Sequence, residues 1–254
     1  TSYSLGGDYT ADADETLYPV WEAFVVNAIA DTYVNPGNSS TVFGTQSSIL
    51  LKNVGPTSSF TRVGYIKFDY DSDFVWDGAA LELLVSANFD GATPNGYNTS
   101  YTTFNVDVFA FNDASWEESS MNFGVVNGTS QDWGLDNSSP FVPDGGTKIG
   151  TIAIPTNADT VGETFSLSNS ILDTFLNNDS DGEVTIYIQR SDLDNQANLS
   201  FATKENTTAG YHGPRLVVAS AGYEYRISYD INGGSGTLPS SGVYTEGGSA
   251  YSIE

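Results

Sequence analysis

Residues 62–69, Arg62-Val63-Gly64-Tyr65-Ile66-Lys67-Phe68-Asp69, carry the pattern that decides the fold class. Successive side chains of a β-strand point to opposite faces, so Ile66 and Phe68 share one face of this segment. The opposite face carries Tyr65, Lys67 and Asp69. We therefore predict that this segment is a β-strand. Its aliphatic and aromatic face with Ile66 and Phe68 packs in a core, and its face with Tyr65, Lys67 and Asp69 is exposed to solvent.

The same alternation recurs along the chain. In residues 184–189, three aliphatic side chains share one face, and Thr185, Tyr187 and Gln189 share the other. Ten segments in all carry apolar or aromatic runs bounded by Gly, Pro, Asn or Asp, as strands do. They are residues 29–34, 48–53, 62–69, 79–87, 103–111, 148–154, 163–167, 183–190, 199–204 and 214–219. The pattern predicts an all-β fold, an antiparallel two-sheet β-sandwich of the jelly-roll type.

One segment, residues 168–178, has apolar residues at helical spacing, and Ser168 or Asn169 would cap this helix. Three regions follow from the pattern. Residues 1–27 form an acidic lead-in that could supply an edge strand or a strand donated to a neighbouring copy. Residues 28–220 form the β-sandwich, and residues 221–254 form a short β-hairpin or a truncated second module. The start at Thr1 and the end at Glu254 lead us to expect a processed chain or a fragment.

Charge and composition exclude several function classes. The 254-residue chain has 32 Asp and Glu but only eight Lys and Arg, which gives a formal net charge of −24. Nucleic-acid binding depends on Lys and Arg contacts to phosphates, so we expect no nucleic-acid partner. No apolar run approaches the length of a membrane span, so we expect no membrane insertion. The chain has no Cys and one His, which excludes thiolate and His-rich metal sites.

An ordered set of short motifs gives a family resemblance. The set includes Ala30-Asp31-Thr32-Tyr33-Val34, Phe43-Gly44, Tyr65-Ile66-Lys67-Phe68-Asp69, Trp116-Glu117-Glu118 and Phe201-Ala202-Thr203-Lys204-Glu205. It resembles the DNRLRE-type domains, which are related to disaggregatase-associated domains and to an alginate-binding carbohydrate-module family. The resemblance covers residues 28–219. It implies a non-catalytic β-sandwich from a large secreted or surface protein.

A second resemblance lies near the C-terminus. Tyr225, Tyr229-Asp230 and Asn232-Gly233-Gly234 follow the pattern of the Listeria–Bacteroides repeat, a small extracellular β module. About half of such a repeat is present over residues 223–254. This resemblance implies a multi-domain extracellular parent protein.

Sugar binding requires aromatic faces that stack on pyranose rings and a few convergent polar groups. The candidates combine outward-facing, cationic and aromatic side chains. They are Arg62, Tyr65, Lys67, Trp133, Tyr187, Gln189, Lys204 and Arg215. An acidic polysaccharide would be repelled by the chain as a whole, so the scarce cations must gather where it binds. The alternative is that Lys67, Lys204 and Arg215 pair with Asp69 and Glu205 in a buried network.

Two further tryptophans, Trp76 and Trp116, are stacking candidates, but Trp116 fits better as a packing residue that seats its loop. Trp133 lies in irregular sequence and is the candidate that we expect to be exposed. Calcium is a plausible cofactor, since hard cations prefer several oxygen ligands. Asp69, Asp71 and Asp73 offer alternating carboxylates, as do residues 177–182. The alternative is that both segments are solvated Asp-rich turns.

Two functions remain open. The first is a non-catalytic carbohydrate-binding module, extracellular or at the cell surface, whose partner is an acidic polysaccharide. The second is a structural surface module, such as an adhesin or filament subunit, that self-associates through an edge strand. Catalysis is not expected, because the single His212 lies outside any triad or lyase motif, although paired carboxylates remain available.

Overall fold

The computed structural model describes residues 24–55, 58–89, 101–127, 131, 133–135, 143, 145–156, 160–193, 197–218, 225–227 and 242–244. The chain divides into two units, Phe24–Ala219 and a second that combines Thr1–Ala23 with Ser220–Glu254. In the second unit the described residues are β12 (Tyr225–Ile227) and β13 (Gly242–Tyr244), which pair antiparallel. The rest of the predicted repeat lies outside the described residues.

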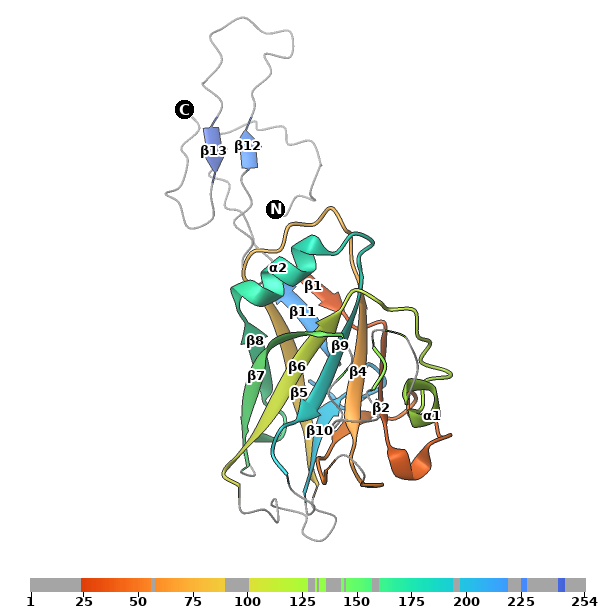
Figure 1. Cartoon of the computed structure of the whole chain (residues 1–254). Coiled ribbons are helices and arrows are strands. Elements are labelled where there is room, and N and C mark those ends of the chain that lie inside the picture. Colours follow the sequence, from red (N-terminus) through yellow and green to blue (C-terminus); the bar gives the residue numbers. More distant parts are fainter. Residues whose placement is uncertain are drawn as a thin grey trace, which may run out of the picture. The chain divides into compact units, whose positions relative to one another are not determined.

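The first unit consists of two antiparallel sheets (Figure 1). The six-stranded sheet contains β1 (Phe24–Asn27), β3 (Ser48–Leu51), β5 (Ala79–Phe89), β8 (Thr164–Ser168), β10 (Asn198–Ala202) and β11 (Arg215–Val218). Its order is β1-β11-β5-β10-β3, and β8 also pairs with β5. The five-stranded sheet contains β2 (Ala30–Val34), β4 (Val63–Asp69), β6 (Thr103–Phe111), β7 (Thr147–Pro155) and β9 (Glu183–Arg190). Its order is β2-β4-β9-β6-β7, which confirms the predicted two-sheet β-sandwich.

Helical structure is confined to short segments among the described residues. The predicted helix is α2 (Ser170–Asn178), and Asn169 caps it by accepting hydrogen bonds from the amides of Ile171 and Leu172. Leu172 and Leu176 are its buried side chains. The sequence pattern did not predict the one-turn α1 (Phe123–Val126) or the 3-10 turn η1 (Pro36–Asn38).

The main core lies between the two sheets. Ile66 and Phe68 are both fully buried, as the alternation in residues 62–69 predicts. Gly64 allows the sheets to approach here, because a Cβ at this position would lie 2.7 Å from Ile49 Cγ2 and 2.8 Å from Ile188 Cγ1. Close packing across Gly64 thus joins β3 of one sheet to β4 and β9 of the other.

A second core covers the opposite face of the five-stranded sheet over β2, β4, β9 and the end of β6. The segment that follows β6 folds back over this face and contributes side chains to a cluster that we call the outer core. Its members are Ala30, Val34, Val63, Tyr65, Phe109, Phe111, Trp116, Met121, Val126, Trp133, Leu135 and Tyr187, with Phe123 packed against them. Both faces of β4 and β9 are therefore buried.

The outer core corrects the prediction that Tyr65, Lys67 and Tyr187 face solvent. Tyr65 and Tyr187 are 0 % exposed and Lys67 is 8 % exposed. Trp133, which we expected to be exposed, is buried as well. Alternation separates the two faces of a strand, but it does not reveal whether a distant segment covers the second face.

Candidate functional site

A small pocket lies at the corner where β3 and β4 separate into different sheets. β3 ends at Leu51 and β4 begins at Val63. Between them, Lys52 and Arg62 form an antiparallel bridge with two backbone hydrogen bonds of 3.1 Å and 2.8 Å. Residues directly opposite in such a pair place their side chains on the same side, so two cationic side chains are brought together.

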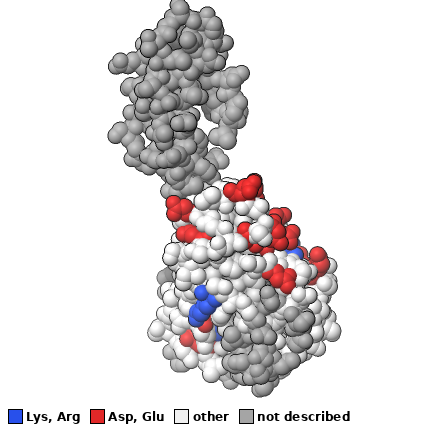
Figure 2. Space-filling model, turned by 45° about the horizontal axis from the view of Figure 1, so that its top comes forward, with Lys and Arg blue, Asp and Glu red and all other residues white. Residues whose placement is uncertain are grey.

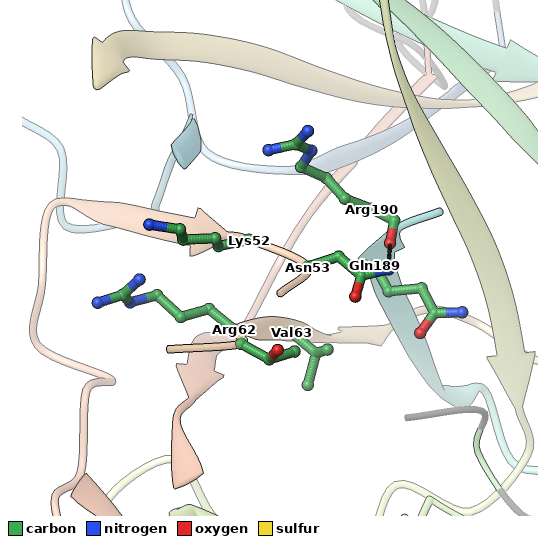
Figure 3. A pocket seen from close by; sticks show the side chains of 7 residues that line it. Lys52, Asn53, Arg62, Val63, Gln189 and Arg190 are labelled. Carbon is green, nitrogen blue, oxygen red and sulfur yellow. Dashed lines mark hydrogen bonds between the residues drawn. The ribbon is translucent and has the colours of Figure 1, made fainter. Parts of the chain in front are cut away.

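The described residues that line this corner pocket come from the β3–β4 corner and the end of β9. They are Lys52, Asn53, Thr61, Arg62, Val63, Gln189 and Arg190 (Figure 3). The Lys52 and Arg62 side chains run side by side in Figure 3, with their charged groups at the same end.

Hydrogen bonds hold the corner in place. Asn53 Nδ2 donates to the Arg190 carbonyl oxygen over 2.8 Å, which ties the β3–β4 corner to the end of β9 (Figure 3). Thr61 Oγ1 donates to the Gly55 carbonyl oxygen over 2.8 Å and accepts from the amide of Val54. These bonds close the loop between the two strands, so the pocket is organised before any ligand arrives.

The charge of Arg62 is only partly satisfied by its neighbours. Its Nη1 donates to two neutral oxygens, the Phe60 carbonyl oxygen at 3.1 Å and Asn198 Oδ1 at 2.9 Å. Burial lowers the pKa of the Arg62 guanidinium below its usual value, because the charged form loses part of its hydration. An anionic ligand beside Arg62 would therefore restore a favourable environment for the charge.

Arg190 plays a different part in the same pocket. It is 1 % exposed, its Nη1 donates to the Ala197 carbonyl oxygen over 2.8 Å, and its guanidinium lies 3.5 Å from the Phe104 ring centroid. The guanidinium thus stacks on an aromatic ring inside the fold. The Arg190 side chain is thus buried in the fold, whereas Arg62 and Lys52 are intermediate in exposure.

The size of the corner pocket limits what it can receive. It has room for about one water-sized group, so it can receive a hydroxyl or one oxygen atom of a carboxylate or sulfate, but not a sugar ring. Next to it, Phe60 is 61 % exposed and lies two residues before Arg62. An exposed aromatic ring beside a cationic pocket can pack against the C–H face of a sugar whose acidic group enters the pocket.

Three of the eight basic residues of the chain line this one pocket. No Asp or Glu is among the described residues that line it. On the face drawn in Figure 2, carboxylate side chains appear at several points, whereas Lys and Arg atoms are confined to small areas. The corner pocket is therefore a local concentration of positive charge on a protein with a net charge of −24.

Two of the sequence-predicted ligand residues, Arg62 and Gln189, lie at the corner pocket. Lys52 and Phe60 were not predicted. A signal for Lys52 existed, since it lies one residue before the end of segment 48–53 while Arg62 begins segment 62–69, and hairpin pairing would place them opposite each other. Phe60 gave no such signal, because Phe side chains are more often buried than exposed.

The predicted residues in the outer core serve the fold. Tyr65 Oη donates to the Trp133 carbonyl oxygen at 3.0 Å, and Lys67 Nζ donates to the Trp116 carbonyl oxygen at 2.6 Å. Burial raises the pKa of the Tyr65 and Tyr187 hydroxyls well above their usual value. Trp116 is buried, and its Nε1 donates to Thr185 Oγ1 at 2.9 Å, which confirms that it seats its loop.

The two remaining cationic candidates are ion-paired. Arg215 Nε lies 2.7 Å from Glu82 Oε2, a pair between β11 and β5. Lys204 Nζ lies 2.9 Å from Glu118 Oε2 and also pairs with Glu205 Oε1. The predicted alternative of pairing with carboxylates thus holds for Lys204, whereas Arg215 pairs with Glu82 rather than with Asp69 or Glu205.

The predicted calcium ligands do not converge. Asp69, Asp71 and Asp73 are exposed, and Asp71 Oδ1 accepts a hydrogen bond from the amide of Asp73, which makes a local turn. In residues 177–182, Asp179 Oδ2 accepts from Tyr70 Oη and from the amide of Gly182. Residues 71–73 thus form a turn, and residues 177–182 comprise the end of α2 and the turn that follows it.

A different group of carboxylates does converge. One oxygen from each of Asp31, Glu118 and Glu205 lies within 4.8 Å of the others, so this group could hold a metal ion. Burial raises the pKa of Asp31 to about 7, and the nearby Glu205 and Glu118 carboxylates act in the same direction. The amide of Lys204 opposes them by donating to Asp31 Oδ2 at 2.8 Å. We call these three residues the carboxylate cluster.

The comparison with protein families gives one match. Residues 22–125 match the model of carbohydrate-binding module family 96. The match supports a carbohydrate-binding module and a polysaccharide partner, and it contains both Lys52 and Arg62. No curated protein sequence matches the chain significantly. Among the described residues, no helix is long and apolar enough to cross a membrane.

Proposed function

We propose that this chain is a non-catalytic carbohydrate-binding module that recognises an acidic polysaccharide at the corner pocket. One observation carries the proposal: three of the eight basic residues of a strongly acidic chain line a single pocket. A neutral glycan could offer only hydroxyl and ring oxygens to these cationic donors. A carboxylate or sulfate group gains charge-assisted hydrogen bonds from it.

The contacts divide the recognition into two parts. One oxygen of the acidic group of a sugar residue enters the pocket beside Arg62 and Lys52, and the rest of that group stays at the pocket mouth. The ring of the same or the next sugar packs against Phe60, which is exposed beside the pocket. The family match over residues 22–125 supports carbohydrate binding in general, and the charge of the pocket supports an acidic ligand in particular.

Among acidic polysaccharides, the resemblance to alginate-binding modules makes alginate the first candidate. We also propose that the module works outside the cell as part of a larger protein and holds an enzyme or a cell on its polysaccharide. A chain with this excess of carboxylates repels most acidic polymers. Attachment through the corner pocket would therefore be selective, which fits this role.

The test is affinity gel electrophoresis of the full chain in gels that contain alginate, carrageenan, agar or fucoidan. Retardation is expected in at least one of the three acidic gels and not in a neutral glucan gel. Arg62→Gln should weaken the affinity by about tenfold or more, since a hydrogen bond to a charged group contributes about 1.5–3 kcal/mol. Phe60→Ala should also weaken it, because the sugar ring loses the aromatic surface that it packs against.

Arg215→Gln is the matched control, because it removes the same charge from a residue that is ion-paired with Glu82. It should leave retardation unchanged. Loss of binding in Arg215→Gln with full binding in Arg62→Gln would overturn the corner pocket as the site. Failure of every acidic gel to retard the wild-type chain would overturn the acidic ligand itself.

A further inference from the structure

The carboxylate cluster joins three segments that are far apart in sequence. Asp31 lies on β2, which is an edge strand of the five-stranded sheet, and Glu118 follows β6. Glu205 follows β10, next to β3 at the edge of the six-stranded sheet. The amide of Asp31 donates to Glu118 Oε1 at 2.8 Å, and the amide of Lys204 donates to Asp31 Oδ2 at 2.8 Å. The cluster thus bridges the edges of both sheets and the segment that builds the outer core.

Two buried oxygens of the cluster have no hydrogen-bond partner among the residues that the structure describes. They are Asp31 Oδ1 and Glu205 Oε2. Asp31 is 0 % exposed, so its free oxygen is shielded from water as well. A buried carboxylate oxygen without a partner is costly, and natural structures satisfy such groups with protein donors, water or an ion.

The charges of the cluster do not balance. Three carboxylates face one ammonium group, that of Lys204, which pairs with Glu118 and Glu205. Asp31 receives only a backbone amide from the same residue. With all three acids ionised, negative charge remains uncompensated at a buried position.

The chain also makes room for the cluster. Gly44 lies against Glu118, and a Cβ at position 44 would come within 2.3 Å of Glu118 Cγ. Any larger residue there would push Glu118 away from Asp31. The absence of a side chain at this position therefore permits the approach of the carboxylates.

We propose that Asp31, Glu118 and Glu205 form a binding site for a divalent cation of the Ca²⁺ type that fastens the outer-core segment to the edges of both sheets. The donors are carboxylate oxygens alone, which suits a hard cation rather than zinc. Ca²⁺ accepts irregular geometry and completes its coordination with water, whereas Mg²⁺ requires a near-ideal octahedron.

Lys204 competes with the cation in this arrangement. Its ammonium group lies between two of the three proposed ligands, so a bound cation must displace it or share Glu118 and Glu205 with it. Removal of the ammonium group should therefore strengthen cation binding. A site in which Lys204 simply completes the structure would respond in the opposite way, because the loss of the ammonium would loosen the carboxylates.

The experiment is a calorimetric titration of the full chain with CaCl₂ after treatment with a chelator, at near-physiological salt. Thermal unfolding with and without CaCl₂ gives a second readout, since a ligand that binds the folded state raises the midpoint. Asp31→Asn and Glu205→Gln should each lower Ca²⁺ affinity by about tenfold or more. Lys204→Gln should raise it by about fivefold or more, as expected when a positive charge about 4 Å away is removed.

Two matched controls separate this site from general attraction of Ca²⁺ to an acidic protein. Lys148→Gln removes the same charge from a residue that pairs with Asp107. Asp73→Asn removes a carboxylate from the exposed turn at 69–73. Both should leave the affinity within about twofold of the wild type, since exposed charges are largely screened.

Several results would overturn the proposal. They are no saturable heat with CaCl₂, weaker binding in Lys204→Gln, or loss of binding in Asp73→Asn with full binding in Asp31→Asn. If Asp31→Asn fails to fold, the Lys204→Gln and Lys148→Gln pair still decides the question. Glycan retardation in the gels tests the corner pocket separately, because none of these variants touches it.

Discussion

In the absence of divalent cations, the ionisation of Asp31 should make the sandwich less stable as pH rises. Burial raises the pKa of Asp31 from 3.8 to about 7. The folded state therefore binds a proton between these two values that the unfolded state has released. Where the folded state binds more protons than the unfolded state, stability falls as pH increases. The contribution of Asp31 is thus neutral below about pH 4 and fully unfavourable above about pH 7.

The size of the effect follows from the pKa difference. A rise from 3.8 to about 7 corresponds to about 4 kcal/mol between the two protonation states. Asp31→Asn removes the charge and keeps the shape, so its free energy of unfolding should lack this contribution. The difference between variant and wild type should grow by about 4 kcal/mol in favour of the variant from pH 4 to pH 7.5.

Urea unfolding with a chelator present, followed by tryptophan fluorescence at a series of pH values, measures this difference. Trp76, Trp116 and Trp133 are all buried, so unfolding changes their environment. Other titrating groups are common to both proteins and largely cancel. A difference that stays constant from pH 4 to pH 7.5 would refute the reasoning, because it would mean that Asp31 titrates alike in the folded and unfolded chains.

Two substitutions test the packing. Tyr65→Phe should cost about 1–3 kcal/mol of unfolding free energy in chemical denaturation, because it leaves the buried Trp133 carbonyl oxygen without its donor. Tyr101→Phe, at an exposed hydroxyl, is the control and should cost less; equal costs would contradict the buried bond. Gly64→Ala should cost about 1–3 kcal/mol through overpacking, since its Cβ would lie 2.7 Å from Ile49 Cγ2. An unchanged free energy of unfolding in Gly64→Ala would show that the two sheets can move apart at this position without loss of stability.

The strands could be predicted from sequence because their signals are local. Each of the ten predicted segments contains a strand of the sandwich, from β2 to β11, since Gly, Pro, Asn and Asp mark its limits. A helix over 168–178 was predicted with Ser168 or Asn169 as its cap, and the structure has α2 at Ser170–Asn178 capped by Asn169. These features depend on a few neighbouring residues each.

The covered second face was not predicted, because it depends on contacts between distant segments. Tyr65 and Tyr187 sit at positions that alternation assigns to solvent, and only the segment after β6 decides otherwise. A hint was present, since residues 116–126 carry Trp, Met, Phe and Val in a stretch without strand periodicity. Apolar residues in a long irregular segment must be buried somewhere, and a sheet face with aromatic residues is the natural place.

The carboxylate cluster shows the same limit. In the sequence, Asp31 is a polar residue inside a short strand. Its amide donates a hydrogen bond to Glu118, which lies 87 residues away in the sequence. No spacing rule connects residues on three separate segments. The corner pocket is intermediate, because Arg62 and Gln189 were predicted from their strands, whereas Lys52 is placed there by its isolated bridge to Arg62.

The outer core also determines how a polymer can engage this protein. The outer core covers β4 and β9 on this face of the five-stranded sheet, so the proposed function leaves the corner pocket to contact one acidic group and an adjacent ring. On the proposed function, attachment through one pocket of this size would be weak, and several modules bound to repeating units of the same polymer would strengthen it. Each further contact then forms at high effective concentration, and attachment becomes steeply sensitive to the spacing of acidic groups along the polymer.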